Sequence, residues 1–285
     1  MSNYLLPEED GLIMQEYGSW TAEKLDYLAR YIDVFETAMR QKWRVRYYVD
    51  LFAGSGKNRV EDSGTVMLGS ALLALTTTYP FTGYFFTDLL EENTQALRQR
   101  CAVSPHYRNV DIHPGDCNDL VNGIVAQIKS DDWRSLNLAF LDPEGLELKW
   151  DTVAKLSAIQ RMDLIINYPQ GGLNRYMPMA FDTDGQTAVD DFFGDREWRK
   201  IYIESLSKPG MHIHRQLMDH YKQKIQGLGY AEVVRDDETG DEPLIRNSRR
   251  NAPLYRLLFA SKSLLGHEFW RKITRRDVHG QARLF

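Results

Sequence analysis

The segment Val49-Asp50-Leu51-Phe52-Ala53-Gly54-Ser55-Gly56 decides the fold class. The aromatic and β-branched run from Arg46 to Phe52 is typical of a strand, and the glycines that follow end it in a tight loop. Glycine lets a backbone approach a ligand closely and adopts positive φ without steric cost. We therefore expect a strand that leads directly into a ligand-binding loop.

Strand-like and helical segments alternate after this loop. Near-continuous apolar strands separated by helices indicate a parallel sheet covered on both faces. Residues 57 to 68 look irregular, and an amphipathic helix is expected before the loop, over Trp20–Trp43. The next expected strands are Gly83–Thr87, Val110–His113, Leu136–Leu141 and Asp163–Asn167, and the helices among them are Ser70–Thr78, Glu91–Cys101, Asn118–Lys129 and Thr152–Ile159.

The last third of the chain has a different pattern. Helices are expected over Asp190–Leu206 and Ile213–Leu228, followed by strands over Tyr230–Arg235 and Leu254–Ala260. Two consecutive strands without a helix between them predict an antiparallel pair at the sheet edge. We expect a single domain over residues 1–285, with an N-terminal helical segment (1–44), a cofactor-binding core (45–170) and a part with further helices, a hairpin and a basic tail (171–285).

The composition of the 285 residues is that of an ordinary globular protein, which excludes wholesale disorder, collagen-like repeats and coiled coil. Two cysteines, Cys101 and Cys117, are too few for a disulfide framework or a Cys-rich zinc site, so a reducing compartment is expected. No apolar run approaches the roughly 18 residues of a membrane span, and the first residues lack a signal-peptide pattern. These features predict a soluble, cytoplasmic protein.

Charge is unevenly distributed along the chain. The whole carries a formal net charge of −5, yet residues 244–285 hold ten Lys or Arg and only two acids. This basic C-terminal segment permits a local phosphate-binding patch for nucleic acid. A solvated face with a frayed tail explains the same pattern equally well, and the sequence leaves both interpretations open.

Three ligand classes compete for the glycine loop. A P-loop requires glycine at the position of Leu51 and Ser or Thr at that of Asn58. A nicotinamide-dinucleotide loop requires a third glycine where Arg59 stands. Both patterns fail, which leaves a loop for S-adenosylmethionine (SAM).

Acidic residues at the ends of the next three strands fit SAM. Asp88 is placed to accept bonds from ribose hydroxyls, Asp116 from an adenine amine, and Asp142 lies at the methyl-transfer point. Hydrogen bonds to charged groups contribute roughly 1.5–3 kcal/mol each, so the set would dominate nucleoside affinity. Asp116 also suits the N-cap of the helix that begins near Asn118.

These residues resemble the class I SAM-dependent methyltransferases. The segment Asp50–Gly56 looks like their first motif, Asp88 their second, Asp116 their third and Asp142-Pro143 their fourth. The resemblance implies a Rossmann-like, mostly parallel seven-stranded sheet with helices on both faces and an antiparallel C-terminal strand pair. The cofactor-binding residues that it implies are Lys24, Asp50, Phe52, Ala53, Gly54, Gly56, Asp88, Leu89, Asp116, Cys117 and Asp142.

More narrowly, the chain resembles the three-Cys-motif partner (TcmP) family. That family is associated with phage or mobile-element genes. The resemblance implies a separately encoded three-cysteine partner protein, itself thought to resemble radical-SAM proteins, and no settled substrate. The matching segments are Tyr17 and Trp20 with Lys24, Tyr48–Gly56, Gly69-Ser70, Asp142-Pro143 with Gly145, Pro253-Leu254-Tyr255 and Ala260-Ser261-Lys262.

The fourth motif departs from that of base-amine methyltransferases, which continue with a second proline and a stacking aromatic. Here Glu144 and Gly145 follow Pro143, which puts base-amine methylation in doubt and makes Glu144 a candidate base or metal-binding acid. Trp150 or Tyr168 would serve as stacking surfaces or as core residues. The predicted catalytic residues are Asp142, Pro143, Glu144 and Tyr168.

Other polar residues near the predicted pocket have two interpretations each. Residues 167–172 form either a substrate loop or an ordinary turn, and Lys24 either pairs with the cofactor's carboxylate or lies on a helix surface. His212, His214 and His220 lack the matching acid of a zinc motif, so structural roles are favoured and no metal site is predicted.

Two functions from different classes follow. The first is a SAM-dependent methyltransferase that acts on nucleic acid or a nucleotide-like acceptor. The second is a methyltransferase-fold protein that binds its three-cysteine partner or DNA with little or no catalysis.

Overall fold

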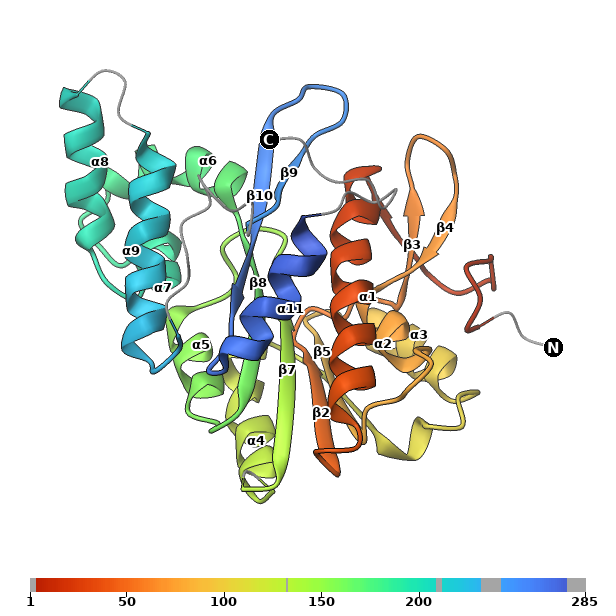
Figure 1. The fold of residues 1–285 in the computed structure, drawn as a ribbon. Coiled ribbons are helices and arrows are strands. Elements are labelled where there is room, and N and C mark those ends of the chain that lie inside the picture. The colour runs from red at the N-terminus through yellow and green to blue at the C-terminus, as the bar shows by residue number, and fades with distance from the viewer. Residues whose placement is uncertain (1–3, 132, 209–211, 232–241, 276–285) are drawn as a thin grey trace.

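A seven-stranded sheet forms the centre of the computed structural model, which describes residues 4–131, 133–208, 212–231 and 242–275 (Figure 1). Its strands lie in the order β6-β5-β2-β7-β8-β10-β9. The first five of these are parallel, whereas β10 is antiparallel to both of its neighbours. The predicted fold class, Rossmann-like with an antiparallel C-terminal pair, is confirmed. The bounds are β2 Val45–Asp50, β5 Gly83–Asp88, β6 Val110–Pro114, β7 Ser135–Leu141, β8 Met162–Tyr168, β9 Leu244–Arg246 and β10 Pro253–Ala260.

Strand β2 lies at the point where the strand order reverses. It pairs with β5 on one side and with β7 on the other, and Asp50 is level with Phe86 and Phe140. The carboxyl ends of the parallel strands therefore meet along one edge of the sheet. In open parallel sheets ligands bind in the crevice outside these ends, beside such a reversal.

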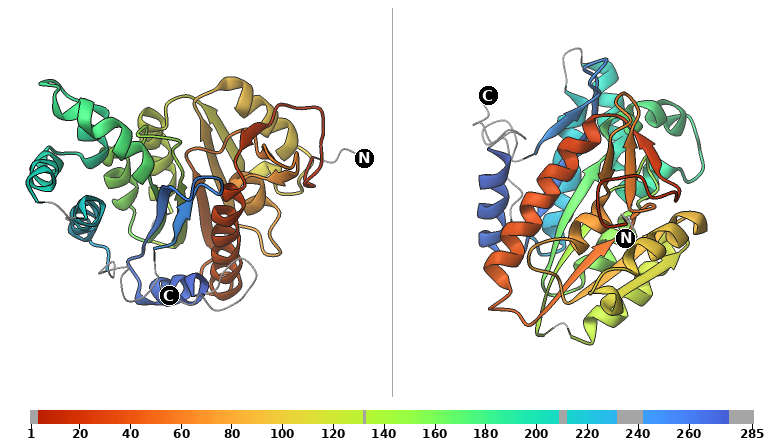
Figure 2. Two further views of the ribbon diagram at one scale, coloured as in Figure 1. Left: turned by 90° about the horizontal axis from the view of Figure 1, so that it is seen from above. Right: turned by 90° about the vertical axis from the view of Figure 1, so that its right-hand side faces the viewer.

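Helices cover both faces of the sheet because strand residues alternate between two core clusters. Tyr48 packs in one cluster and Val49 in the other. Helices α1 and α11 lie side by side on the first face, which Figure 2 shows from two directions. That face is covered by α1 Trp20–Met39, α2 Ser70–Leu75, α3 Glu91–Cys101 and α11 Leu264–Thr274, and the other by α4 Cys117–Lys129, α5 Trp150–Ser157, α6 Gln170–Phe181, α7 Ala188–Phe193, α8 Glu197–Ser207 and α9 Ile213–Gly227. A 3-10 turn, Tyr107–Asn109, precedes β6.

The expected helix over Asp190–Leu206 is wrong, because the chain breaks there into α7 and α8. Gly194 ends α7 with φ 68°, a conformation that favours glycine. A Cβ at this position would lie 2.5 Å from the ring of Trp150, so close packing also requires glycine.

The prediction that residues 57–68 are irregular is wrong as well. A second, three-stranded sheet contains β1 Gln15–Tyr17, β3 Lys57–Val60 and β4 Val66–Leu68. Strand β1 is parallel to β3, and β3 and β4 form a hairpin. These strands are short, and much of β3 is polar, so their pattern alone does not predict them.

Buried charges fasten the N-terminal segment to the glycine loop. Asp10 accepts Arg100 Nη2 on Oδ1 and Lys57 Nζ on Oδ2, each at 2.8 Å, and all three side chains have 0–1% exposure. Arg100 also donates to the carbonyl oxygen of Ser55, inside the loop. Although burial opposes ionisation, the bonds from Arg100 and Lys57 hold the pKa of Asp10 well below its usual range.

The antiparallel C-terminal pair is present, but the strand beside β10 is not the one predicted over Tyr230–Arg235. Strand β10 pairs with β9, whereas Tyr230 and Ala231 lie outside any strand. The rest of the predicted strand, residues 232–235, lies outside the described residues. Of the helices that the structure describes, none is long and apolar enough to cross a membrane.

Candidate functional site

The glycine loop after β2 is fixed by bonds to the end of β5. Ala53 N donates to the carbonyl oxygen of Thr87 at 2.9 Å, and Gly54 N donates to Asp88 Oδ2 at 3.0 Å. Gly54 and Gly56 have φ values of 59° and 90°, which side chains other than glycine rarely adopt. The loop and Asp88 thus form one unit at the carboxyl edge of the sheet.

Side chains of other elements pack closely against both glycines. A Cβ on Gly54 would lie 2.1 Å from Gln15 Oε1, and one on Gly56 would lie 2.7 Å from Leu97 Cδ1. Gln15 belongs to β1, which the sequence did not predict, and no pattern in the sequence marks it as a neighbour of the loop.

Asp50 lies beneath the loop and is completely buried. Its Oδ1 accepts a bond from the amide of Phe52 at 3.2 Å. Burial raises the pKa of Asp50 to about 7, although Ser70 and the Phe52 amide act in the opposite direction, and the charges of Asp142 and Asp88 raise it further. The Asp50 side chain therefore supports the loop from within.

Asp88 accepts bonds from three donors. Gly54 N bonds to Oδ2, while Leu90 N and Asn93 Nδ2 bond to Oδ1 at 2.9 and 2.8 Å. A carboxylate has about four acceptor positions, so capacity for a further donor remains on Oδ2. Leu89, directly after Asp88, is 69% exposed and offers an apolar surface at the mouth of the site.

Asp116 caps helix α4, so the helix-cap interpretation is confirmed. Its Oδ1 accepts from the backbone and side-chain nitrogens of Asn118 at 2.8 and 2.7 Å. Both bonds use the same oxygen of an exposed residue, which directs Oδ2 toward solvent or a ligand. Cys117 is buried behind it, and burial raises the pKa of its thiol to about 12.

Asp142 is held between two nitrogen donors at the end of β7. Lys24 Nζ from α1 forms an ion pair with Oδ2, and Asn167 Nδ2 from β8 donates to Oδ1 at 2.7 Å. Asn167 Nδ2 also lies 3.4 Å from the carbonyl oxygen of buried Pro143. The ring of Tyr255 from β10 lies 5.2 Å from Lys24 Nζ.

Glu144 extends from the same turn toward strand β1. The hydroxyl of Tyr17 donates to Glu144 Oε1 at 2.7 Å. Burial, and then the bond to Glu144, raise the pKa of the Tyr17 hydroxyl well above its usual range, and the charges of Asp142 and Asp88 act in the same direction. Tyr17 is therefore a neutral donor that lies close to three acids at the ends of β5 and β7.

Two predictions for the acceptor side require correction, and the structure decides between two alternatives for a third residue. Tyr168 is completely buried, with its ring against Phe192 and Tyr221, so this conformation does not present it to an acceptor. Residues 167–172 do not form a loop, because β8 continues to Tyr168 and α6 begins at Gln170. Trp150 packs against Tyr221 and serves the core.

The structure brings together residues that the sequence did not connect. The sequence marks Tyr17 and Lys24 only through a family resemblance, and Lys24 also as a ligand of the cofactor. Their contacts with Glu144 and Asp142 depend on the fold. Asn167 ends an expected strand, and the structure adds its bond to Asp142, which the sequence does not predict.

The basic C-terminal segment divides into exposed and inward-facing residues. Exposed Arg249, in the β9–β10 hairpin, pairs with Asp62 in the β3–β4 hairpin. Arg256 lies near Gln170, and Lys262 Nζ donates to the carbonyl oxygens of Ser157 and Ile159. Arg276 and Arg283 lie outside the described residues.

His214 and His220 have local partners. His214 Nε2 lies 2.6 Å from Asn174 Oδ1, and burial together with nearby Arg256 lowers the pKa of His214 to about 4. His220 contacts Asp195. Among the described residues, no group of three or more His, Cys, Asp or Glu side chains is arranged to hold a metal ion.

Fold and site together define a Rossmann-like α/β protein with a glycine loop and acidic side chains at the carboxyl ends of its parallel strands. No family model matches the chain, and no curated protein matches it. Among solved structures it is similar to the O-methyltransferase TomG from Streptomyces achromogenes in complex with SAM, with 11% identity over 92% of this chain and 94% of that chain and a TM-score of 0.43. It is also similar to Trm1 from Pyrococcus horikoshii with SAM, with 9% identity over 91% of this chain and 59% of that chain and a TM-score of 0.44.

Proposed function

We propose that this protein is a SAM-dependent methyltransferase that acts on nucleic acid or a nucleotide-like acceptor. The bond from Gly54 N to Asp88 Oδ2 carries the proposal. It joins the glycine loop, whose two glycines have positive φ, to the acid at the end of β5. The bond lies at the point where the strand order reverses, which is where open parallel sheets bind their ligands.

The residues present fit SAM. Gly54 and Gly56 provide a loop without side chains, and Asp88 Oδ2 retains capacity for a ribose hydroxyl. Exposed Leu89 would pack against the adenine, and Asp116 Oδ2 would accept from its amine. SAM, when bound, supplies an activated methyl group for direct displacement.

The acceptor would meet the turn that contains Asp142 and Glu144. Asp142 is oriented by Lys24 and Asn167, so it would present its carboxylate in a fixed direction. Glu144, bonded to the neutral hydroxyl of Tyr17, is the acid that would take up a proton from the acceptor. Alignment of this kind lowers barriers by roughly 7–11 kcal/mol.

Nucleic acid or a nucleotide is favoured as acceptor by the arginines of the β9–β10 hairpin. Arg246, Arg249 and Arg250 are exposed there, and Arg249 reaches Asp62 of the β3–β4 hairpin. Figure 1 shows the two hairpins flanking the end of the sheet at which the parallel strands terminate. A phosphate would compete with Asp62 for Arg249, and binding would weaken as salt rises.

We also propose that the chain works with a three-cysteine partner protein and belongs to the TcmP family of phage or mobile-element origin. The segments that resemble that family support this part of the proposal. Among them, Tyr17, Lys24 and Tyr255 lie around Glu144 and Asp142 in the fold.

Calorimetry with SAM and its demethylated product tests cofactor binding. We expect binding tighter than millimolar, and we expect Asp88→Asn to weaken it by about tenfold or more, since a bond to a charged group is lost. Asp111→Asn, on the neighbouring strand β6, is the matched control. An absence of binding by the wild-type protein would overturn the methyltransferase proposal.

Labelled-methyl transfer to DNA, RNA, nucleotides and the three-cysteine protein then identifies the acceptor. A binding role with little catalysis is the second candidate, and one observation favours it: both oxygens of Asp142 already have partners within the chain. SAM binding with no labelled acceptor of any class would favour that role.

A further inference from the structure

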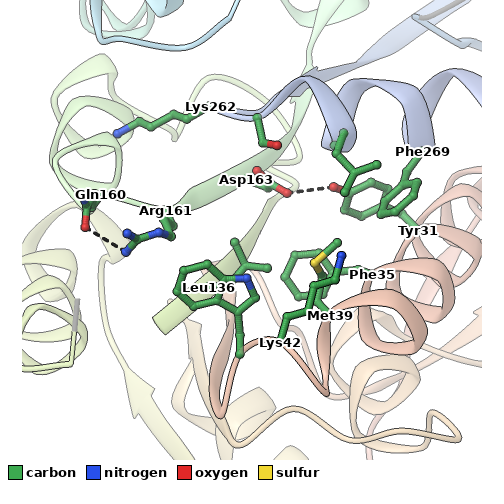
Figure 3. A pocket seen from close by; sticks show the side chains of 14 residues that line it. Tyr31, Phe35, Met39, Lys42, Leu136, Gln160, Arg161, Asp163, Lys262 and Phe269 are labelled. Carbon is green, nitrogen blue, oxygen red and sulfur yellow. Dashed lines mark hydrogen bonds between the residues drawn. The ribbon is translucent and has the colours of Figure 1, made fainter. Parts of the chain in front are cut away.

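We propose that a cavity at the amino edge of the sheet binds a small amphipathic anion, a compound with an aromatic or branched apolar body and one acidic group. The cavity encloses about 490 Å³ between α1, α11 and the first residues of β7 and β8 (Figure 3). Ligand pockets in proteins typically have volumes of roughly 300–1,000 Å³, so the size suits a small organic molecule.

The cavity is separate from the proposed SAM site. Asp163 lies near the start of β8, whereas Asn167, which contacts Asp142, lies near the end of the same strand. Four residues of strand span roughly 13 Å, so the two sites lie toward opposite ends of β8. Occupation of one site therefore leaves the other free.

Apolar side chains form most of the wall. Tyr31, Phe35 and Met39 line it from one face of α1, Phe269 from α11, and Leu136 from β7. Figure 3 shows these side chains grouped around the cavity, with the hydroxyl of Tyr31 turned toward Asp163. A wall of aromatic and aliphatic groups favours a flat or branched apolar body.

The charges of the lining select an anion. Lys42, Arg161 and Lys262 are three basic residues against one acid, Asp163. The acid is nearly buried and accepts a 2.8 Å bond from the hydroxyl of Tyr31, so it lies at one wall. The ammonium of Lys262 is bonded to the carbonyl oxygens of Ser157 and Ile159, so an acidic group would gain its charge-assisted bonds from Lys42 or Arg161. A cation would meet a lining with a net positive charge.

Arg161 is already oriented for this role. Its guanidinium lies 4.6 Å from the ring centre of Trp43, and Nη1 donates to Gln160 Oε1 at 2.8 Å. A guanidinium held against an aromatic face has a fixed plane, and its charge would attract a carboxylate or sulfonate. Because the Arg161 side chain is already ordered, less side-chain entropy is lost when an anion binds.

Two fluorescent probes that differ in one group test the proposal on the full chain. 1-Anilinonaphthalene-8-sulfonate carries the acid, and N-phenyl-1-naphthylamine has the same aromatic body without it. We expect the sulfonate to bind at one site at least about tenfold more tightly, as expected for a hydrogen bond to a charged group. Equal affinity of the two probes, or no binding of either, would overturn the proposal.

Variants locate the probe. Leu265 lines the cavity and is 36% exposed, whereas adjacent Leu264 is 75% exposed and is not part of the lining. Leu265→Glu should weaken sulfonate binding by about tenfold, and Leu264→Glu should not. Lys42→Gln should likewise weaken it, with Arg44→Gln as control, since Arg44 is exposed outside the lining. Unchanged affinity in both cavity variants, or displacement of the probe by SAM, would place the probe elsewhere and refute the assignment.

Discussion

Lys24 Nζ forms an ion pair with Asp142 Oδ2, although 118 residues separate the two in the chain. The pair joins the first turns of α1 to the end of β7, where Asn167 holds the other carboxylate oxygen. Their side chains are only 10% and 15% exposed, so the attraction is weakly screened by solvent. A residue from the N-terminal helix thus fixes the orientation of the acid that the fourth motif supplies.

Lys24→Met should lower the free energy of unfolding by about 3 kcal/mol, because it leaves the Asp142 charge largely buried with only a neutral amide as partner. Lys200→Met is the matched control, since Lys200 pairs with Glu197 on the surface and its loss should cost less than about 0.5 kcal/mol. Urea denaturation of both variants measures the difference. A cost for Lys24→Met as small as that of the control would contradict a structural role for the pair.

Asp10→Asn should destabilise the protein by about 3–5 kcal/mol, since it leaves the buried charges of Arg100 and Lys57 uncompensated. Glu9→Gln is the control, because the Glu9 side chain is 63% exposed in its pair with Arg59. Denaturation gives the energies, and limited proteolysis should cut the Asp10→Asn variant within the first residues. Resistance to protease together with unchanged stability would refute the proposed anchoring of the N-terminal segment.

The parallel strands of the sheet, and the acids at their carboxyl ends, could be predicted from the sequence because both depend on local signals. Apolar runs mark β2, β5, β7 and β8, and each predicted acid lies at the end of the expected strand or within two residues after it. Gly54 and Gly56 similarly predict a tight loop, and both residues have positive φ in the structure. The carboxyl ends of parallel strands share one edge, so these residues had to converge.

Contacts that depend on distant parts of the chain could not be predicted in this way. Strand β1 has three residues and forms only because β3 provides a partner, so its pattern is too short to recognise. Tyr168 follows an apolar run that is buried throughout, and periodicity does not distinguish a core tyrosine from a stacking one. The break at Gly194 depends on the ring of Trp150, which comes from α5.

Asp163→Asn should change how stability depends on pH. Burial raises the pKa of Asp163 to about 6, above its unfolded value of 3.8, against the lowering effect of bonds from Ser261 and Tyr31. Below pH 3.8 the raised pKa contributes about 3 kcal/mol to the free energy of unfolding, and this contribution is lost as the pH rises through about 6. Asn does not titrate, so the free energy of unfolding of the variant should rise relative to that of wild type as the pH increases between these two values.

Urea denaturation of wild type and Asp163→Asn at intervals from pH 4 to pH 8 measures this loss. Tyr31→Phe is an informative companion, because removal of its hydroxyl should extend the loss to higher pH. A constant difference between wild type and Asp163→Asn across the range would show that the carboxyl is not perturbed.

Gly54→Ala should weaken SAM binding by at least about tenfold, which corresponds to about 1.4 kcal/mol. An alanine at φ 59° is strained, and its Cβ would also displace the end of the Gln15 side chain. Relief of the strain should move the loop and carry Gly54 N away from Asp88. Gly64→Ala separates strain from binding, because Gly64 has φ 66° with no atom within 4 Å of the added Cβ. Both variants should lose about 1–2 kcal/mol of stability, but only Gly54→Ala should lose affinity in calorimetry. Equal affinities in the two variants would mean that the glycine loop does not contact the cofactor, and SAM would then have to bind elsewhere on the chain.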